Sequence, residues 1–443
     1  MKCFKPLLFL IAPLLLSGCS GSEPTPTTTS VNPSQTSGQV TFEMQGVLGT
    51  NSHQITVDWN DNCFKESATT LNDDLKMLSF ASSMVSHSTS TAGSFFGTIG
   101  FSNLQGSFGT PNAETMGYIL ASKTIADFEV VALSIRGLNY GAEWSNNLKV
   151  GQSGDHAGFA ERADEMYGIL KEYLKSYSDK NVKLWISGYS RAGGIANVLA
   201  SKLMKGTEIV ANENNLFVYT FEAPRGLSQE NAVAYNNVFN FVNSFDLVAQ
   251  IAPEAYGLYR CGKDIIINEN KNPDELLAAF DPNLALPAFR PNETYYPTEQ
   301  DFSKYILNEL LKDTEEAETN LNTRDAFYQN YQGAIAHFMA LYFSLPTLTA
   351  NKIKSGLQSM SAYEIFVMLS DNDGLYKFIK AILDEDSIPY EESQLQPTCY
   401  SLTLLVRAKI TLVYNIYSDE NGKSNLSRTL MMHTPDLVYV LIK

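Results

Sequence analysis

The sequence predicts an α/β protein with a mostly parallel central sheet and a largely helical insertion toward its C-terminal end. Three observations support this prediction. Residues 182–200, VKLWISGYSRAGGIANVLA, change across one sharp turn from a β-favouring apolar run to apolar residues at helical spacing. Strand-like and helix-like runs alternate between residues 128 and 242. Beyond about residue 255 the apolar segments become long and mostly helical in spacing, and few turn residues interrupt them.

The N-terminal 39 residues are expected to lie outside this fold. Residues 1–18 carry two lysines and an apolar run ending in Leu-Ser-Gly before Cys19, a pattern similar to a bacterial lipoprotein signal peptide. It implies cleavage before Cys19, lipidation of that cysteine, and a lipid anchor in the bacterial cell envelope facing outside the cytoplasm. An ordinary secretory signal is the alternative. Residues 19–39, rich in Ser, Thr and Pro, are typical of a flexible tether.

Residues 40–260 are predicted to form the α/β core, in which strands that follow helices in sequence favour a parallel, covered sheet. The expected elements, in chain order, are a strand pair at 40–60, a helix at 71–85, a strand at 128–135, a helix at 158–177, the strand–turn–helix at 182–203, and strands at 216–221 and 238–242.

Residues 261–425 are predicted to be a mainly helical cap or insertion, and residues 426–443 to return to the core. The expected helical segments are 302–316, 324–343, 362–384 and 398–417. The β-branched residues of 402–417 also permit a strand there. The aromatic and methionine side chains of this region suit either an ordinary core or a pocket for an acyl chain.

Composition excludes several classes of function. The 443 residues include 48 acidic and 32 basic ones, giving a formal charge of −16, so a nucleic acid is not an expected partner. The chain has no CxxC or HExxH spacing, and we predict no metal and no other cofactor. Once Cys3 is cleaved off and Cys19 is lipidated, three cysteines remain, and the sequence does not tell whether two of them pair: Cys63, Cys261 and Cys399.

Ser190 stands at the turn between the strand and the helix of residues 182–200. A hydroxyl there leaves the carboxyl edge of the sheet above a helix N-terminus, where N–H groups favour developing negative charge. Gly188 and Ala192 flank it, as a close strand–helix approach requires. This is how an α/β-hydrolase presents its nucleophile, although the G-x-S-x-G pattern would place glycine at position 192.

Acyl transfer also needs a base and an acid that orients the base. Asp246, in FVNSFDLV, directly follows an expected strand, so its carboxylate would emerge at the same sheet edge as Ser190. Because this fold orders its residues as Ser, acid, His, the histidine is expected after Asp246. His433, in MMHTPDLVYV, is the first candidate and His337, within an apolar helical run, is the second.

Four motifs in this order resemble those of the class 3 lipase family, the fungal-lipase type of α/β-hydrolase, and in particular its bacterial members. Residues 131–137, VALSIRG, resemble a strand that ends in FRG; residues 155–159, DHAGF, resemble HxGF; residues 219–225, YTFEAPR, resemble TFGAPR; residues 242–248, VNSFDLV, resemble VNxxDxV. The resemblance covers about residues 65–265 and the last fifteen residues.

The resemblance implies a serine ester hydrolase acting on lipid esters, with Ser190 as nucleophile, Asp246 as the orienting acid and His433 as base. It also implies an oxyanion hole built from the backbone N–H groups of Leu138 and Arg191. Leu138 stands where the family often has Thr or Ser, which removes a side-chain donor. A catalytically weak or inactive surface binding protein on the same fold is therefore the alternative, and a peptidase or acyltransferase with the same triad is a third.

Overall fold

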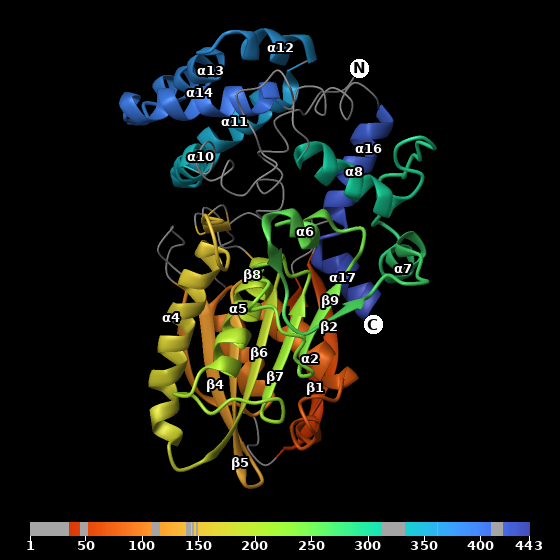
Figure 1. Cartoon of the computed structure of the whole chain (residues 1–443). Coiled ribbons are helices and arrows are strands. Elements are labelled where there is room, and N and C mark those ends of the chain that lie inside the picture. The colour runs from red at the N-terminus through yellow and green to blue at the C-terminus, as the bar shows by residue number, and fades with distance from the viewer. Residues whose placement is uncertain are drawn as a thin grey trace. The chain divides into compact units, whose positions relative to one another are not determined.

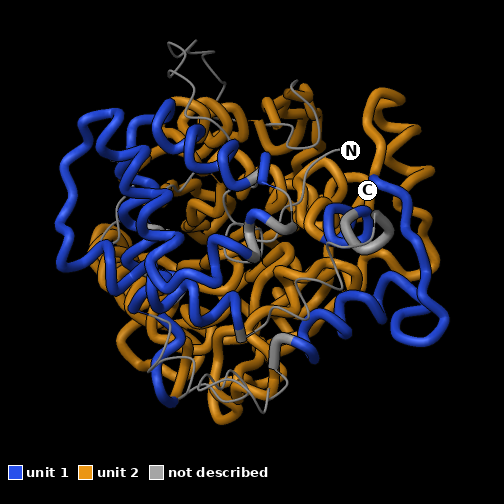
Figure 2. Tube along the Cα trace, turned by 90° about the horizontal axis from the view of Figure 1, so that it is seen from above, with its two compact units in different colours: residues 1–16, 141–153, 287–429 blue, residues 17–140, 154–286, 430–443 orange. Residues whose placement is uncertain are grey.

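The structure, a computed structural model, describes residues 35–44, 52–108, 116–138, 143, 146–147, 149–311, 333–360, 362–408 and 420–443. The chain divides into two compact units, coloured separately in Figure 2. Unit 2 comprises residues 17–140, 154–286 and 430–443, and unit 1 comprises residues 1–16, 141–153 and 287–429. The predicted signal peptide and Cys19 lie outside the described residues. No helix in the described part of the chain is long and apolar enough to cross a membrane.

Unit 2 is built on a seven-stranded sheet of order β11-β9-β7-β6-β5-β4-β3 (Figure 1). Its strands are β3 (Ser102–Ser107), β4 (Tyr118–Ile125), β5 (Phe128–Ile135), β6 (Asn181–Tyr189), β7 (Leu216–Phe221), β9 (Val238–Val242) and β11 (Lys263–Ile266). All neighbours from β5 to β11 are parallel, whereas β3 and β4 join antiparallel at one edge. The mostly parallel sheet with helices on both faces confirms the α/β-hydrolase architecture that the sequence predicts.

The strands alternate their side chains between two apolar cores. On one face, Trp185 and Phe217 pack with the antiparallel pair β1 (Ser37–Met44) and β2 (His53–Asn60), and with α2 (Asp73–Val85), α3 (Thr89–Thr98) and α17 (Pro435–Ile442). On the other face, Leu184 and Val218 pack with α4 (Ala157–Leu174) and α5 (Arg191–Lys205). Because both faces are covered, the central strands are buried along almost their whole length.

The remaining elements of unit 2 are short. They are η1 (Asp61–Phe64), η3 (Lys175–Tyr177), β8 (Leu227–Ser228), α6 (Leu247–Gln250), η4 (Glu254–Tyr256), β10 (Leu258–Tyr259) and α7 (Pro273–Phe280). The sequence boundary placed residues 261–286 in the insertion, but they lie in unit 2, because β11 pairs with β9 and Phe280 of α7 packs against Tyr439 of α17.

Unit 1 is mainly helical in its described part. Its helices are α8 (Glu299–Leu311), α10 (Gly333–Ser344), α11 (Thr347–Ser359), α12 (Ala362–Ser370), α13 (Gly374–Glu385), α14 (Glu392–Ala408) and α16 (Glu420–Met431), the last two residues of α16 belonging to unit 2. One core cluster joins the apolar side chains of α10, α11, α13 and α14. The segment permitted as a strand, 402–417, is helical as far as residue 408, and the rest lies outside the described residues.

One expected helix, 362–384, is interrupted. Asp371 ends α12 by accepting a hydrogen bond from the backbone N–H of Asp373, a local turn that competes with helix. At Gly374 a Cβ atom would lie 1.9 Å from the carbonyl oxygen of Met368, so only glycine permits this close chain reversal. The apolar spacing continues across the break, which is why the sequence pattern did not reveal it.

Candidate active site

Ser190 lies at the turn where β6 ends and α5 begins. Its φ of 56° and ψ of −129° match the first central position of a type II′ turn, which usually holds glycine. The backbone N–H of Ser190 donates to the carbonyl of Phe221 on β7, over 2.8 Å, and so ties the turn to the neighbouring strand. A serine rarely adopts this positive φ, so the backbone at Ser190 is strained. Such strain is typical of turns at functional sites.

Two glycines permit this turn. A Cβ atom at Gly137 would lie 2.0 Å from the carbonyl oxygen of Tyr189, and one at Gly188 would lie 2.5 Å from that of Ala192. Real Cβ atoms do not approach oxygen so closely, so both positions require glycine. Ala192, the departure from the G-x-S-x-G pattern, is accommodated fully buried in the first turn of α5.

Asp246 lies just after β9 and begins the short helix α6. Its Oδ1 accepts a hydrogen bond from the backbone N–H of Val248 at 2.8 Å, which fixes the carboxylate as an N-cap. Its Oδ2 lies 2.6 Å from Nδ1 of His433. The side chain is fully buried, so the carboxylate is oriented by these contacts and not by water.

His433 lies between α16 and α17, and its Nε2 is 2.7 Å from Oγ of Ser190. The backbone around the histidine is held by two side chains of the sheet. The hydroxyl of Tyr189 donates to the carbonyl of His433, and Nδ2 of Asn243 donates to the carbonyl of Met432 at 3.3 Å. Ser190, His433 and Asp246 thus form one continuous, buried hydrogen-bonded chain within unit 2. Such a chain can activate a serine hydroxyl and stabilise an imidazolium.

The two residues predicted for an oxyanion hole are Leu138 and Arg191, of which Arg191 directly follows Ser190. Arg191 is the first residue of α5, so its backbone N–H belongs to the first helical turn, whose N–H groups have no acceptor within the helix. Leu138 directly follows Gly137 and is a partly buried side chain packed against the core cluster that contains Trp185 and Phe217.

The other histidines lie elsewhere. His337 is half-buried in α10 of unit 1. His156 is the N-cap of α4 and accepts a hydrogen bond from the N–H of Phe159, on whose ring it stacks at 4.0 Å between centroids.

Glu222 is a site residue that the sequence reasoning missed. It follows β7 with a φ of 48°, is fully buried, and one of its carboxyl oxygens lies within 4.8 Å of one of Asp246. The pKa of Glu222 is raised well above its ordinary value, mainly by burial and then by the nearby Asp246 carboxylate. The available signal was the glutamate in YTFEAPR, where the resembling motif has glycine.

Glu222, Asp246 and His433 place three potential metal-ligand atoms within 4.8 Å of one another. However, both imidazole nitrogens of His433 already take part in hydrogen bonds, Nδ1 with Asp246 and Nε2 with Ser190. The arrangement therefore fits proton transfer better than metal coordination.

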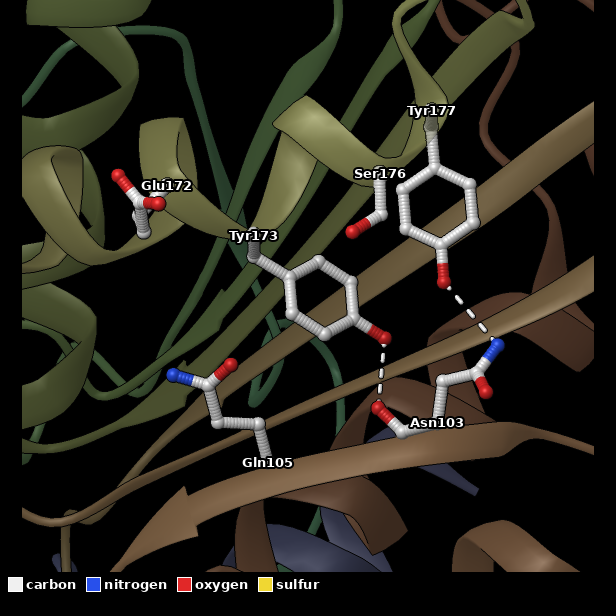
Figure 3. Close-up of a pocket in the computed structure, with 6 residues that line it drawn as sticks. All are labelled: Asn103, Gln105, Glu172, Tyr173, Ser176 and Tyr177. Carbon is white, nitrogen blue, oxygen red and sulfur yellow. Dashed lines mark hydrogen bonds between the residues drawn. The ribbon is translucent and has the colours of Figure 1, made fainter.

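A separate pocket of about 400 Å³ lies beside the edge strand β3, α4 and η3. In Figure 3 the hydroxyl of Tyr173 points to the carbonyl of Asn103, which accepts its hydrogen bond at 2.8 Å, and the amide of Asn103 donates to the hydroxyl of Tyr177 at 3.1 Å. The pocket contains none of the three residues of the buried chain.

Comparison with known proteins gives one family match. Residues 132–256 match the model of the family described as lipase (class 3). The matched range includes Ser190, Glu222 and Asp246, while His433 lies beyond it. No protein of the curated set matches significantly.

Solved structures with some similarity include three fungal lipases. A fungal lipase in an inhibitor complex has 17% sequence identity and a TM-score of 0.36, over 44% of this chain and 80% of that one. The Rhizomucor miehei lipase with its propeptide has 18% identity and a TM-score of 0.35, over 45% of this chain and 70% of that one. Lipase II from Rhizopus niveus has 13% identity and a TM-score of 0.33, over 44% of this chain and 81% of that one. The family match supports an enzyme, a carboxylic-ester hydrolase of the lipase type.

Proposed function

We propose that the protein is a serine ester hydrolase that cleaves lipid esters through an acyl-enzyme, with Ser190, His433 and Asp246 as its catalytic residues. The observation that carries the proposal is the continuous contact from Oγ of Ser190 to Nε2 of His433 (2.7 Å) and from Nδ1 of His433 to Oδ2 of Asp246 (2.6 Å). A nucleophile, a base and an orienting acid at hydrogen-bond distance are what acyl transfer requires.

In the proposed reaction, Oγ of Ser190 attacks the ester carbonyl while Nε2 of His433 accepts the hydroxyl proton. Asp246 stabilises the resulting imidazolium through Nδ1. The backbone N–H groups of Leu138 and Arg191 stabilise the oxyanion of the tetrahedral intermediate. His433 then returns the proton to the leaving alcohol, and a water molecule activated by the same histidine releases the acid from Ser190.

Lipid esters are the proposed substrates, and the support for them is the match to the lipase family. The acyl chain and the head group are left open by the proposal. We further propose that lipidated Cys19 anchors the protein to a membrane of the bacterial cell envelope. Its support is the lysine-flanked apolar run before Leu-Ser-Gly-Cys. An anchor would hold the enzyme at the surface where lipid esters are concentrated.

A binding protein with little or no turnover is the second candidate, and two observations favour it. Leu138 offers no hydroxyl to an oxyanion, and losing one such donor lowers kcat by about a hundredfold or more. Ser190 is only 7% exposed, so a reagent has limited access to its hydroxyl.

The deciding experiment combines a fluorophosphonate probe, peptide mass spectrometry and a panel of esters from short to long acyl chains. The proposal predicts an adduct on Ser190, turnover of esters, and loss of both in Ser190→Ala. Neither adduct nor turnover, in detergent micelles as well as in buffer, would favour the binding protein. An adduct on another serine would refute the assignment of the nucleophile.

A further inference from the structure

We propose that Glu222 is a positioning residue of this site: a neutral carboxylic acid that donates a hydrogen bond to the Asp246 carboxylate and so extends the chain to Ser190–His433–Asp246–Glu222. The inference rests on the proposed function for its catalytic consequence. Its structural part, a proton shared between two carboxyl groups, is argued from their burial and from the distance of at most 4.8 Å between them.

A strained backbone and two hydrogen bonds hold the Glu222 carboxyl group near Asp246. A φ of 48° is a left-handed conformation that favours glycine, and it costs a larger residue about 1 kcal/mol or more. The backbone N–H of Asn243 donates to both carboxyl oxygens of Glu222, at 3.0 and 3.1 Å. Asn243 also holds the loop of His433 through the carbonyl of Met432. Glu222 is therefore fixed by the same residue that positions the base.

The charges around Glu222 favour a neutral acid. Asp246 lies within 4.8 Å and, like Glu222, is 0% exposed, so two negative charges here would repel each other without water to screen them. The guanidinium of Arg260 acts on Glu222 only weakly, because it donates to the carbonyls of Ala223 and Ala249 and to the carboxylate of Asp264. One proton shared by the two carboxyl groups resolves the repulsion.

The shared proton would have two effects on the reaction. It adds a third contact to Asp246, whose Oδ1 accepts from Val248 and whose Oδ2 faces His433, and so restricts the carboxylate to one orientation. It also keeps the net charge of the carboxyl pair at −1, so that the basicity of His433 reflects one carboxylate and not two.

Two variants separate the protonated from the ionised state. Glu222→Gln keeps an N–H donor for Asp246 and an oxygen for the N–H of Asn243, but it cannot ionise. Glu222→Gly removes the donor and suits the positive φ. We would measure kcat and KM for a soluble ester from about pH 5 to 9, and the thermal midpoint of each variant over the same range.

If Glu222 is neutral, Glu222→Gln keeps kcat/KM within about threefold of the wild type and leaves the acid limb of its pH profile in place. Glu222→Gly lowers kcat by about tenfold or more with little change in KM, because only the orientation of Asp246 is lost. A neutral native Glu222 that ionises on unfolding destabilises the wild type as pH rises. The thermal midpoint of Glu222→Gln should therefore gain on the wild type between about pH 5 and 8.

Three results would overturn the inference. An acid limb lowered by about one unit in Glu222→Gln would show that a negative charge had been removed. A thermal difference between Glu222→Gln and wild type that is constant with pH would also show an ionised Glu222. Wild-type kcat and pH profile in Glu222→Gly would leave Glu222 without a positioning role. Failure of the proposed function is distinct, because an inactive wild type leaves the thermal measurement intact.

Discussion

Replacing Ser190 tests the strained turn and the nucleophile together. Ser190→Ala and Ser190→Gly both remove the hydroxyl that faces His433, so their difference isolates the backbone. The φ of 56° costs a residue with a Cβ atom about 1–3 kcal/mol, and glycine avoids this penalty. Glycine in turn loses about 0.5–1 kcal/mol through greater chain entropy in the unfolded state. We therefore expect the glycine variant to be more stable than the alanine variant by about 1 kcal/mol.

The assay is urea unfolding followed by tryptophan fluorescence. Two of the three tryptophans, Trp59 and Trp185, are buried in the sheet core of unit 2 and report on it directly. For a chain of 443 residues, about 1 kcal/mol would move a thermal midpoint by only about 1 °C, so the urea midpoint is the more sensitive readout. An alanine variant as stable as the glycine variant would refute the strain argument. Both variants should lose ester hydrolysis by a factor of about 10⁴ or more, and retained turnover would refute the nucleophile.

Three further predictions concern the base, the turn and the anchor. His433→Ala should lower kcat by about 10³ or more, whereas His337→Ala should leave it within about twofold; steady-state kinetics giving the reverse order would move the base to α10. Gly188→Ala should lower the free energy of unfolding by about 2–3 kcal/mol, because its Cβ atom would lie 2.5 Å from the carbonyl oxygen of Ala192. Ala192→Gly, the matched control, should lower the free energy of unfolding by only about 1 kcal/mol. Equal urea midpoints for the two variants would contradict the close-packing argument. Cys19→Ser should move the protein from the membrane to the soluble fraction on fractionation, and continued membrane association would indicate another attachment.

The sequence predicted best those features whose cause is local. The runs that become β5, β7 and β9 were expected at the observed bounds, because a buried parallel strand is a short apolar run between turns. It missed β3, whose residues SNLQGS are all exposed and show no apolar alternation. It also missed the tight turn between β4 and β5, where Ala126 adopts a φ of 54° without the glycine or asparagine that usually marks such turns.

The candidate site divides in the same way. Ser190, Asp246 and His433 were proposed from chain order and their flanking runs, and the structure joins these three by hydrogen bonds. Glu222 was not proposed, since nothing within a few residues of it shows that Asp246 will lie beside it. A buried carboxyl pair is a long-range property that follows from the parallel pairing of β7 with β9.

The long separation between acid and base is tolerable because α17 anchors the base. Asp246 and His433 are 187 residues apart. Closing a flexible loop of that length costs only about 1.5 kcal/mol more than closing one a fifth as long, because the entropy grows with the logarithm of length. Every residue of α17 is buried, and the ring of its Tyr439 packs against the rings of Phe80 and Phe280. Burying one such apolar side chain contributes about 1.5–3 kcal/mol. The burial of one or two side chains of α17 therefore offsets the added entropy of loop closure. The insertion between the two catalytic candidates can therefore vary in length while the position of His433 is kept by the helix that follows it.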